Sequence, residues 1–118
     1  MKEKVIRGDI YYANLDGSIG SEQSGTRPVI IVQNNRGNMF SPTTIVLPIT
    51  KKINFKTEIP THLDLSHTKY LEFDSIILAE QIRTLDKKRL IKKIGHINDF
   101  QLLQDLNKKI SIALDIKN

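Results

Sequence analysis

The hydrophobic pattern of this chain changes its period once, near Asn98, and this change limits the folds that the chain can adopt. Upstream of Asn98, apolar and β-branched residues form short runs separated by Gly, Pro, Asn and Ser, a pattern typical of short β-strands. Downstream, apolar residues recur at intervals of three and four, at Phe100, Leu103, Leu106, Ile110, Ala113 and Leu114. This spacing predicts one amphipathic helix over residues 99–114, and the pair Asn98 and Gln101 resembles a capping box at its start.

Strands are expected before the helix, over residues 6–15, 28–33, 43–49, 61–65 and 91–97. Residues 75–85 begin with a run that looks fully buried, but Glu80, Gln81 and Arg83 then bring polar groups that a plain core strand would not carry. Asp86 has the character of an N-cap for one helical turn. Several short strands followed by one helix predict a mainly β fold with a C-terminal α-helix, a small closed or half-closed barrel covered at one side.

The amino-acid composition limits the classes of function that this protein can have. A chain of 118 residues has room for one core, so a single domain over residues 1–118 is expected. Lysine and arginine outnumber aspartate and glutamate by five and the pI is near 9.5, which favours a polyanionic partner, although solvated surfaces can be equally basic. The absence of cysteine excludes disulfides, thiol nucleophiles and most zinc sites. No apolar signal region or membrane-length run is present, so a soluble, cytoplasmic protein is expected.

The stretch of residues 20–34, which reads G-S-E-Q-S-G-T-R-P-V-I-I-V-Q-N, is the main candidate for a functional site. It begins as a small polar loop, passes through Arg27 and Pro28, and enters a β-branched run. Pro28 holds Arg27 in an extended conformation between a buried strand and a loop. An arginine fixed in this way presents a planar fork of donors to a phosphate. The alternative is an arginine that marks the start of an edge strand and points into solvent.

Other candidates for chemistry are weaker. His62, His67 and His96 have no metal-ligand spacing, so each is interpreted first as a surface or structural histidine, and no metal or other cofactor is expected. Glu22 and Glu80 are candidate carboxylates, but the sequence does not show whether they converge. The glycines near residue 20 lack the spacing and the following lysine of a phosphate-binding loop, which argues against nucleoside triphosphate chemistry.

Thr50 ends an apolar strand just before Lys51 and Lys52, where its hydroxyl could donate to a phosphate oxygen held by basic neighbours. The alternative is a threonine that only ends the strand. A second basic run, comprising Lys87, Lys88, Arg89, Lys92 and Lys93, could steer a polyanion, but a charged, solvated face is the more common explanation.

Taken together, these fragments resemble the MazF/PemK toxins of bacterial toxin-antitoxin pairs over nearly the whole chain. The matching fragments are R-G-D-I-Y-Y-A-N-L at residues 7–15, G-S-E-Q-S-G-T-R-P-V at 20–29, V-Q-N at 32–34, N-M-F-S-P-T at 38–43, P-I-T at 48–50, P-T-H at 60–62 and L-A-E-Q-I-R-T-L-D-K-K-R-L at 78–90. Each fragment alone is a weak signal, but their order and spacing are highly specific. The sequence departs from many members of the family at Ser24, Thr26 and Asn35, which bears on base preference.

The resemblance implies an SH3-like barrel with a C-terminal helix that forms a homodimer and acts as a metal-independent endoribonuclease on single-stranded RNA, chiefly mRNA. It assigns catalysis to Arg27 and Thr50. The RNA-binding residues that it implies are Ser21, Glu22, Gln23, Asn34, Phe40, Glu80 and Gln81. It further implies a short recognition motif with an ACA core, and an acidic antitoxin that blocks the RNA groove.

The implied reaction agrees with the residue types present. RNA supplies its own nucleophile, the 2′-hydroxyl, so the protein has only to align it, stabilise the phosphorane and help proton transfer. The expected products are a 2′,3′-cyclic phosphate and a 5′-hydroxyl. Two alternatives from other classes remain at this point. One is a non-catalytic SH3-like module that binds RNA or an acidic peptide, and the other is a toxin of the same fold that acts on gyrase.

Overall fold

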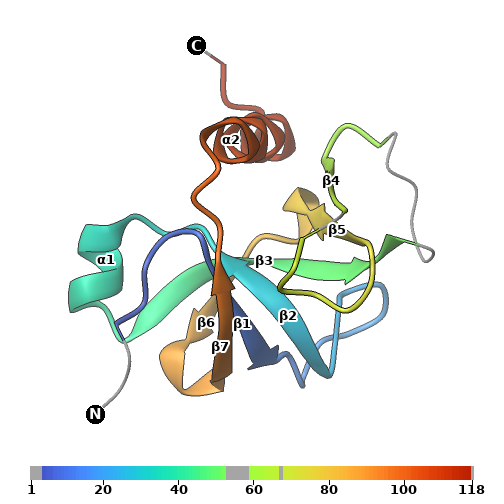
Figure 1. The fold of residues 1–118 in the computed structure, drawn as a ribbon. Coiled ribbons are helices and arrows are strands. Elements are labelled where there is room, and N and C mark those ends of the chain that lie inside the picture. The colour runs from blue at the N-terminus through green and yellow to red at the C-terminus, as the bar shows by residue number, and fades with distance from the viewer. Residues whose placement is uncertain (1–3, 53–58, 67, 118) are drawn as a thin grey trace.

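The computed structural model describes residues 4–52, 59–66 and 68–117. Most of the described elements are short strands, and the longest helix closes the chain (Figure 1). In chain order they are β1 (Asp9–Asn14), β2 (Thr26–Ile31), α1 (Asn35–Phe40), β3 (Thr43–Lys51), β4 (His62–Leu65), β5 (Ser75–Leu78), the 3₁₀ turn η2 (Ala79–Gln81), β6 (Arg83–Asp86), the 3₁₀ turn η3 (Lys87–Arg89), β7 (Leu90–His96) and α2 (Phe100–Leu114).

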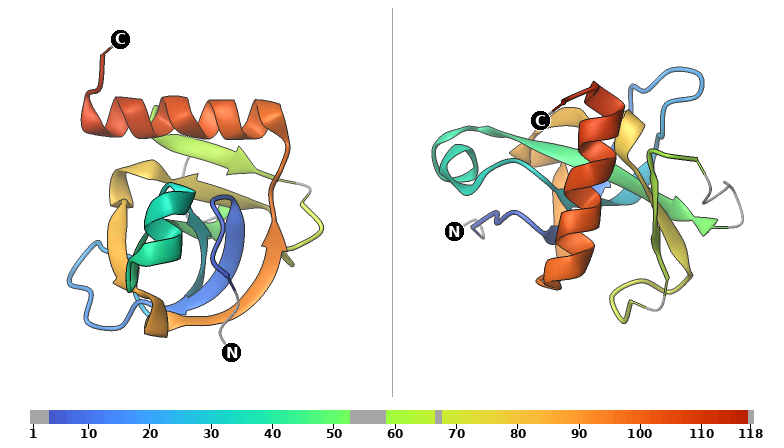
Figure 2. Two further views of the ribbon diagram at one scale, coloured as in Figure 1. Left: turned by 90° about the vertical axis from the view of Figure 1, so that its left-hand side faces the viewer. Right: turned by 90° about the horizontal axis from the view of Figure 1, so that it is seen from above.

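All strand pairs are antiparallel, in the order β4-β5-β3-β2-β1-β7, and β6 also pairs with β3. The nine residues of β3 hold the sheet together, because their first half pairs with β6 and their last three residues pair with β5. The strands curve around one another into a half-closed barrel, and α2 lies across one side of it (Figure 2). The expected class, mainly β with a C-terminal helix, is confirmed.

Two clusters of buried side chains occupy the two faces of the central strands. Along β1, Ile10 belongs to the cluster beneath α2, whereas Tyr11 and Ala13 belong to the cluster inside the barrel. Along β2 the same alternation places Ile30 in the first cluster and Val29 in the second. This period of two follows from the opposite directions of successive side chains in a strand. Leu106 fixes α2 to the first cluster and is 1% exposed.

The predicted strands and the C-terminal helix are present, with ends shifted by a few residues. The predicted turn after Asp86 is confirmed as η3, with the Asp86 side chain accepting a hydrogen bond of 2.8 Å from the Lys88 amide. The predicted cap of α2 is wrong by one residue, because Asp99 rather than Asn98 accepts the hydrogen bond from the Leu102 amide, at 3.2 Å. The cap therefore follows the side chain whose oxygen reaches the first turn.

Two further features were not assigned as elements from the sequence. The polar segment after β2 forms the short helix α1, whose N-cap Asn34 accepts a hydrogen bond of 2.8 Å from the Gly37 amide. The buried Asn38 supports this helix by accepting a hydrogen bond of 2.7 Å from Thr44. The run over residues 75–85 divides into β5 and β6 around η2, at the position of the polar residues noted in the sequence. No described helix is long and apolar enough to span a membrane.

Candidate active site

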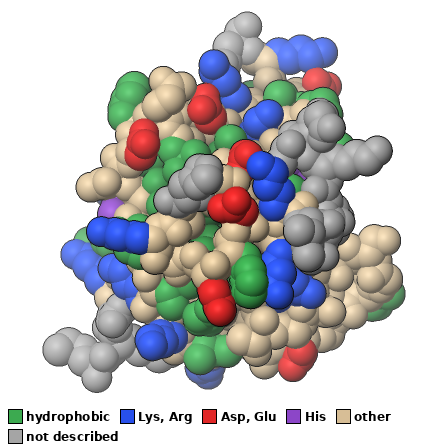
Figure 3. Space-filling model, turned by 45° about the vertical axis from the view of Figure 1, so that its right-hand side comes forward, with side chains coloured by type: hydrophobic (Ala, Val, Ile, Leu, Met, Phe, Trp, Pro, Cys, Tyr) green, Lys and Arg blue, Asp and Glu red, His purple; other side chains and the backbone are tan. Residues whose placement is uncertain are grey.

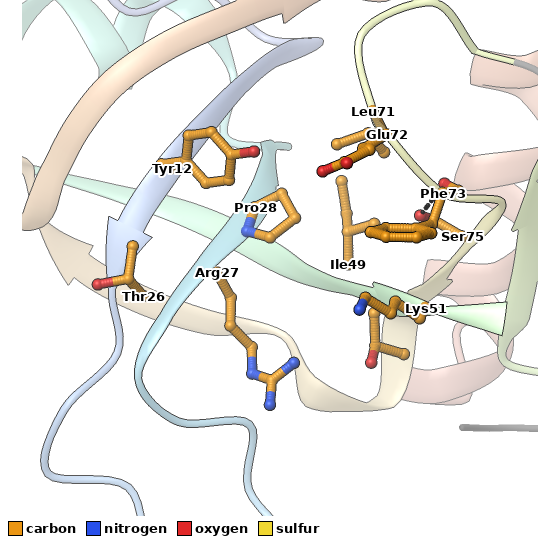
Figure 4. Close-up of a pocket in the computed structure, with 11 residues that line it drawn as sticks. Tyr12, Thr26, Arg27, Pro28, Ile49, Lys51, Leu71, Glu72, Phe73 and Ser75 are labelled. Carbon is orange, nitrogen blue, oxygen red and sulfur yellow. Dashed lines mark hydrogen bonds between the residues drawn. The ribbon is translucent and has the colours of Figure 1, made fainter. Parts of the chain in front are cut away.

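The ladder between β2 and β3 brings the two expected catalytic residues together. Val29 pairs with Pro48, and extending this register by two residues places Arg27 opposite Thr50. Both residues line the same cavity of about 220 Å³ (Figure 4). The complete set of lining residues is Tyr12, Thr26, Arg27, Pro28, Ile49, Thr50, Lys51, Leu71, Glu72, Phe73 and Ser75. Residues that are 23 positions apart in the sequence thus form one site, here called the Arg27 pocket.

Arg27 is oriented by the chain that precedes it. Its Nε donates a hydrogen bond of 2.8 Å to the carbonyl oxygen of Ser24. The terminal nitrogens of its guanidinium make no hydrogen bond or ion pair with the described residues, so they remain available for an incoming anion. Pro28 follows inside β2 and is paired with Tyr12 of β1, which fixes the backbone at the root of the arginine. A guanidinium tethered through Nε presents its outer two nitrogens as a fork.

Thr50 lies near the end of β3 and is 3% exposed, so its hydroxyl belongs to the wall of the pocket and not to the open surface. Its backbone is held on the other side by β5, where it pairs with Ile76. The next residue, Lys51, is exposed and extends over the ring of Phe73, with its Nζ 4.0 Å from the ring centroid. A second cation therefore lies at the pocket beside Arg27.

The opposite wall comes from the connection between β4 and β5, which the sequence did not identify as functional. Leu71, Glu72 and Phe73 all line the pocket from this connection, and Tyr12 joins them from β1. In Figure 4 the carboxylate of Glu72 and the hydroxyl of Tyr12 point toward one another, across the pocket from the Arg27 guanidinium. This segment has no periodic pattern and no motif, so the sequence offered no signal for its role.

The loop between β1 and β2 is fastened beside the pocket by one glutamine of η2. Gln81 accepts a hydrogen bond of 2.8 Å from the Gln23 amide through its Oε1, and its Nε2 donates at 3.3 Å to the carbonyl oxygen of Ser21. Arg83 adds a hydrogen bond of 2.8 Å to the hydroxyl of Ser18. Three residues expected to bind RNA, namely Ser21, Gln23 and Gln81, are thus brought together by direct contact.

The two carboxylates singled out in the sequence do not line the Arg27 pocket. Glu80 accepts a hydrogen bond of 2.9 Å from the Thr61 hydroxyl and lies 3.0 Å from Nε2 of His62. Glu22 accepts a hydrogen bond from the amide of Ile19 within its own loop. Each acid therefore has a structural partner. Their proposed contact with RNA is a separate matter and stays a prediction.

Asn34 and Phe40 lie at the other end of the strands that carry Arg27 and Thr50. Asn34 caps α1, and Phe40 is the last residue of that helix. Phe40 is 73% exposed, and its ring centroid lies 5.8 Å from the guanidinium carbon of Arg36. Figure 1 shows α1 on the far side of the sheet from the β4 and β5 end. Within one protomer, these two predicted RNA-binding residues do not join the Arg27 pocket.

The histidines have structural surroundings where they are described. His62 is 3% exposed and packs against Glu80, and Nδ1 of His96 lies 2.8 Å from the buried carboxylate of Asp9. His67 lies outside the described residues. Over residues 4–52, 59–66 and 68–117, no group of three or more His, Asp or Glu side chains is arranged to hold a metal ion.

The positive charge of the site comes from a few side chains at the pocket itself. Figure 3 shows Lys and Arg side chains interspersed with acidic ones on one face, with no continuous basic patch among the described residues in that view. Within the pocket, Arg27 and Lys51 supply positive charge, while Tyr12, Thr50 and Ser75 supply hydroxyl groups. Across from them lies the carboxylate of Glu72, in the β4–β5 connection. This set suits binding of a phosphodiester and transfer of protons around it.

Comparison with known proteins shows the family of this chain. A family model described as the PemK-like, MazF-like toxin of type II toxin-antitoxin systems matches residues 6–114. The chain belongs to this toxin family. Among its relatives, the endoribonuclease MazF of Staphylococcus saprophyticus is 50% identical over 111 residues, which cover 93% of this chain and 91% of the relative. The endoribonuclease EndoA of Bacillus subtilis is 48% identical over 111 residues, covering 93% and 94%.

Solved structures share the fold of the toxin family. An endoribonuclease in complex with its cognate antitoxin from a mycobacterial species matches with a TM-score of 0.79 at 23% identity, covering 97% of this chain and 98% of that one. MazF from Deinococcus radiodurans also matches with a TM-score of 0.79, at 18% identity, covering 98% and 100%. At these identities the likeness concerns the fold alone. The resemblance stated from the sequence fragments is confirmed by the family match and the two relatives.

Proposed function

We propose that this protein is an endoribonuclease toxin that cuts single-stranded RNA at the Arg27 pocket without a metal ion. The observation that carries the proposal is that Arg27 and Thr50 line one cavity, together with Lys51. The names of the two relatives, both endoribonucleases, support the same activity. The pocket offers cations and hydroxyls for a phosphodiester, which is the chemistry that RNA cleavage through its own 2′-hydroxyl requires.

In this mechanism Arg27 and Thr50 act on the scissile phosphate. The tethered guanidinium of Arg27 binds the non-bridging oxygens and neutralises charge as the phosphorane forms. The Thr50 hydroxyl donates to one of the same oxygens. The 2′-oxygen attacks phosphorus, the 5′-oxygen leaves, and the products are a 2′,3′-cyclic phosphate and a 5′-hydroxyl. No metal enters this scheme.

Base recognition is assigned to the loop that Gln81 holds in place. Ser21 and Glu22 on this loop and Glu80 of η2 are exposed, and their oxygens can read the edges of unstacked bases. Gln23 and Gln81, which are hydrogen-bonded to one another, are assigned to the same recognition site. We expect a short motif with an ACA core. Asn34 and Phe40 are too far along β2 and β3 to reach the same nucleotide within one protomer, so they are assigned to a flanking part of the RNA.

The partners of the proposed enzyme are a second copy of the chain and an acidic antitoxin. Ile112 and Ile116 near the C-terminus are each 52% exposed, which leaves apolar surface for a subunit contact. The antitoxin covers the Arg27 pocket, where its acidic groups pair with Arg27 and Lys51, and so excludes the RNA substrate. The mycobacterial endoribonuclease that shares this fold is bound to its cognate antitoxin, which supports the pairing. We place the protein in the cytoplasm, where mRNA is available.

The test is cleavage of a defined RNA by the purified protein in the presence of EDTA, with end-group analysis of the fragments. We expect cleavage that EDTA does not inhibit, a 2′,3′-cyclic phosphate on one fragment, and no cleavage when the scissile nucleotide carries 2′-deoxyribose. The Arg27→Ala variant should fold normally and leave the RNA intact. Binding without cutting would favour the alternative, a non-catalytic RNA-binding module, and cleavage of the 2′-deoxy substrate would exclude the mechanism.

A further inference from the structure

We propose that Glu72 is the general base of the reaction, the group that removes the proton from the attacking 2′-hydroxyl. This proposal rests on the proposed ribonuclease function. Glu72 supplies the only carboxylate among the described residues that line the Arg27 pocket. Neither the sequence motifs nor the fragments shared with the toxin family point to this residue, which comes from the connection between β4 and β5.

The other polar groups at the pocket are poor proton acceptors. Arg27 and Lys51 carry positive charge near neutral pH, so neither accepts a proton. Thr50, Ser75 and Tyr12 offer hydroxyl groups, which are weak bases. A carboxylate is the remaining group in the pocket that can take a proton and later release it to solvent.

The two acids singled out in the sequence are already occupied. Glu80 is bonded to Thr61 and His62 through its two oxygens, and Glu22 accepts from the backbone of its own loop. The carboxylate of Glu72, in contrast, makes no hydrogen bond or ion pair with any described residue. Glu72 is solvent-exposed, so a substrate bound in the pocket can reach its carboxylate.

The placement of Glu72 fits the geometry of the reaction. Figure 4 shows its carboxylate across the pocket from the guanidinium of Arg27, with the Tyr12 hydroxyl turned toward it. In an in-line displacement, the attacking and leaving oxygens lie on opposite sides of phosphorus. With the 5′-oxygen leaving on the Arg27 side, as proposed below, the attacking 2′-hydroxyl lies on the opposite side, which is that of Glu72. Tyr12 is 38% exposed and can hold the ribose by a hydrogen bond from its own hydroxyl.

Protons and electron pairs balance over this reaction. Glu72 takes the proton of the 2′-hydroxyl while the 2′-oxygen forms its bond to phosphorus. The bond from phosphorus to the 5′-oxygen breaks, and this oxygen keeps the electron pair and takes a proton from water on the Arg27 side. Glu72 then releases its proton to solvent. The charged groups that face this carboxylate across the pocket are Arg27 and Lys51, and Tyr12 is the other titratable side chain beside it.

The first experiment compares Glu72→Gln with Asp74→Asn as the matched control, because Asp74 is a neighbouring exposed acid that does not line the pocket. We expect kcat of Glu72→Gln to fall by about 10²- to 10⁴-fold with KM nearly unchanged, and Asp74→Asn to retain its rate. The acidic limb of the pH profile of kcat should disappear in Glu72→Gln and remain in Glu72→Asp. Added formate should restore part of the rate of Glu72→Ala.

A substrate with sulfur in place of the 5′-oxygen distinguishes a general base from a general acid. A thiolate leaves without taking a proton, so the reaction of this substrate needs no general acid. Glu72→Gln should therefore stay slow on this substrate. If Glu72 were instead the general acid, the sulfur substrate would restore the rate of Glu72→Gln. A rate of Glu72→Gln within about threefold of the wild type, an unchanged acidic limb, or rescue by the sulfur substrate would overturn the assignment. If the wild type cuts RNA and only Arg27→Ala fails, the ribonuclease function stands and Glu72 is not its base. If the wild type cuts no RNA, both proposals fall.

Discussion

The Nε of Arg27 donates a hydrogen bond of 2.8 Å to the carbonyl oxygen of Ser24, three residues earlier in the chain. This contact takes up the inner nitrogen of the guanidinium and leaves the outer two facing outward as a pair. The loop before β2 therefore sets the direction of the arginine, and Thr50 on β3 supplies the second polar group from the neighbouring strand. The site lies where a strand meets a loop that hydrogen bonds with Gln81 and Arg83 hold in place.

Replacement of Arg27 with lysine should keep the positive charge but lose the paired donors that contact two phosphate oxygens. Lysine has a single nitrogen, so it cannot bond to Ser24 and contact two phosphate oxygens together. We expect Arg27→Lys to cut RNA at least about tenfold more slowly while binding it with an affinity within a few fold of the wild type. Single-turnover cleavage and fluorescence anisotropy measure the two quantities. Wild-type cleavage rates in Arg27→Lys would show that positive charge alone suffices.

Removal of the Gln81 side chain should loosen the loop without unfolding the barrel. In Gln81→Ala the Gln23 amide and the Ser21 carbonyl lose their side-chain partner, so we expect faster amide hydrogen exchange across residues 18–24 and weaker base selectivity. Thr84→Ala is the control, because Thr84 is exposed on β6 nearby. Sequencing of cleavage ends across a transcript pool measures selectivity. Equal exchange rates in Gln81→Ala and the wild type would contradict the role of this residue.

Substitution of Gly95 should test the packing of the first core cluster. A Cβ at Gly95 would lie 2.3 Å from Cγ of Tyr70, closer than any tolerated contact, and the obstructing ring sits in a packed site. We expect Gly95→Ala to lower the free energy of unfolding by about 1–3 kcal/mol, measured by urea denaturation. Tyr70→Ala added to Gly95→Ala should relieve the clash, so the two changes should cost less together than their sum. Strict additivity of the two changes would show that the ring and the new Cβ do not collide.

The ion pair between Lys52 and Asp64 predicts a small dependence of stability on pH. Hydrogen bonds from Ser66 and then from Lys52 hold the pKa of Asp64 below its usual value, and the bond to Asp64 raises the pKa of Lys52. A lowered carboxylate pKa contributes stability above the unfolded pKa, and this contribution disappears as pH falls through the folded pKa. Both side chains are more than 40% exposed, so solvent screening keeps the effect small.

The Asp64→Asn variant measures this contribution. We expect it to be slightly less stable than the wild type at neutral pH, with the difference shrinking toward zero as pH is lowered to about 2. Thermal unfolding at a series of pH values follows the difference. A gap that stays constant down to the lowest pH would mean that the charge of Asp64 is not its cause. Added salt should also narrow the gap at neutral pH, since the pair is exposed.

The sequence on its own determined the elements whose cause is local. Short runs of apolar and β-branched residues marked β1, β2, β3, β4 and β7, and spacing by three and four marked α2. Asp86 indicated η3 because a side-chain oxygen before a turn reaches only the next few amides. The sequence also identified Arg27, from its position between a loop and a buried strand, and the order of the shared fragments by itself indicated the toxin family.

Only the tertiary structure decided which distant groups meet. Polar residues after β2 form α1 because Asn38 is buried against Thr44, a contact that no local pattern contains. Glu22 and Glu80 looked alike as candidate acids, yet each is bonded elsewhere, while Glu72, on a segment without pattern, reaches the Arg27 pocket. Periodicity reports which face of an element is apolar. It carries no information about which loops the strand register draws together, and that register assembled the site.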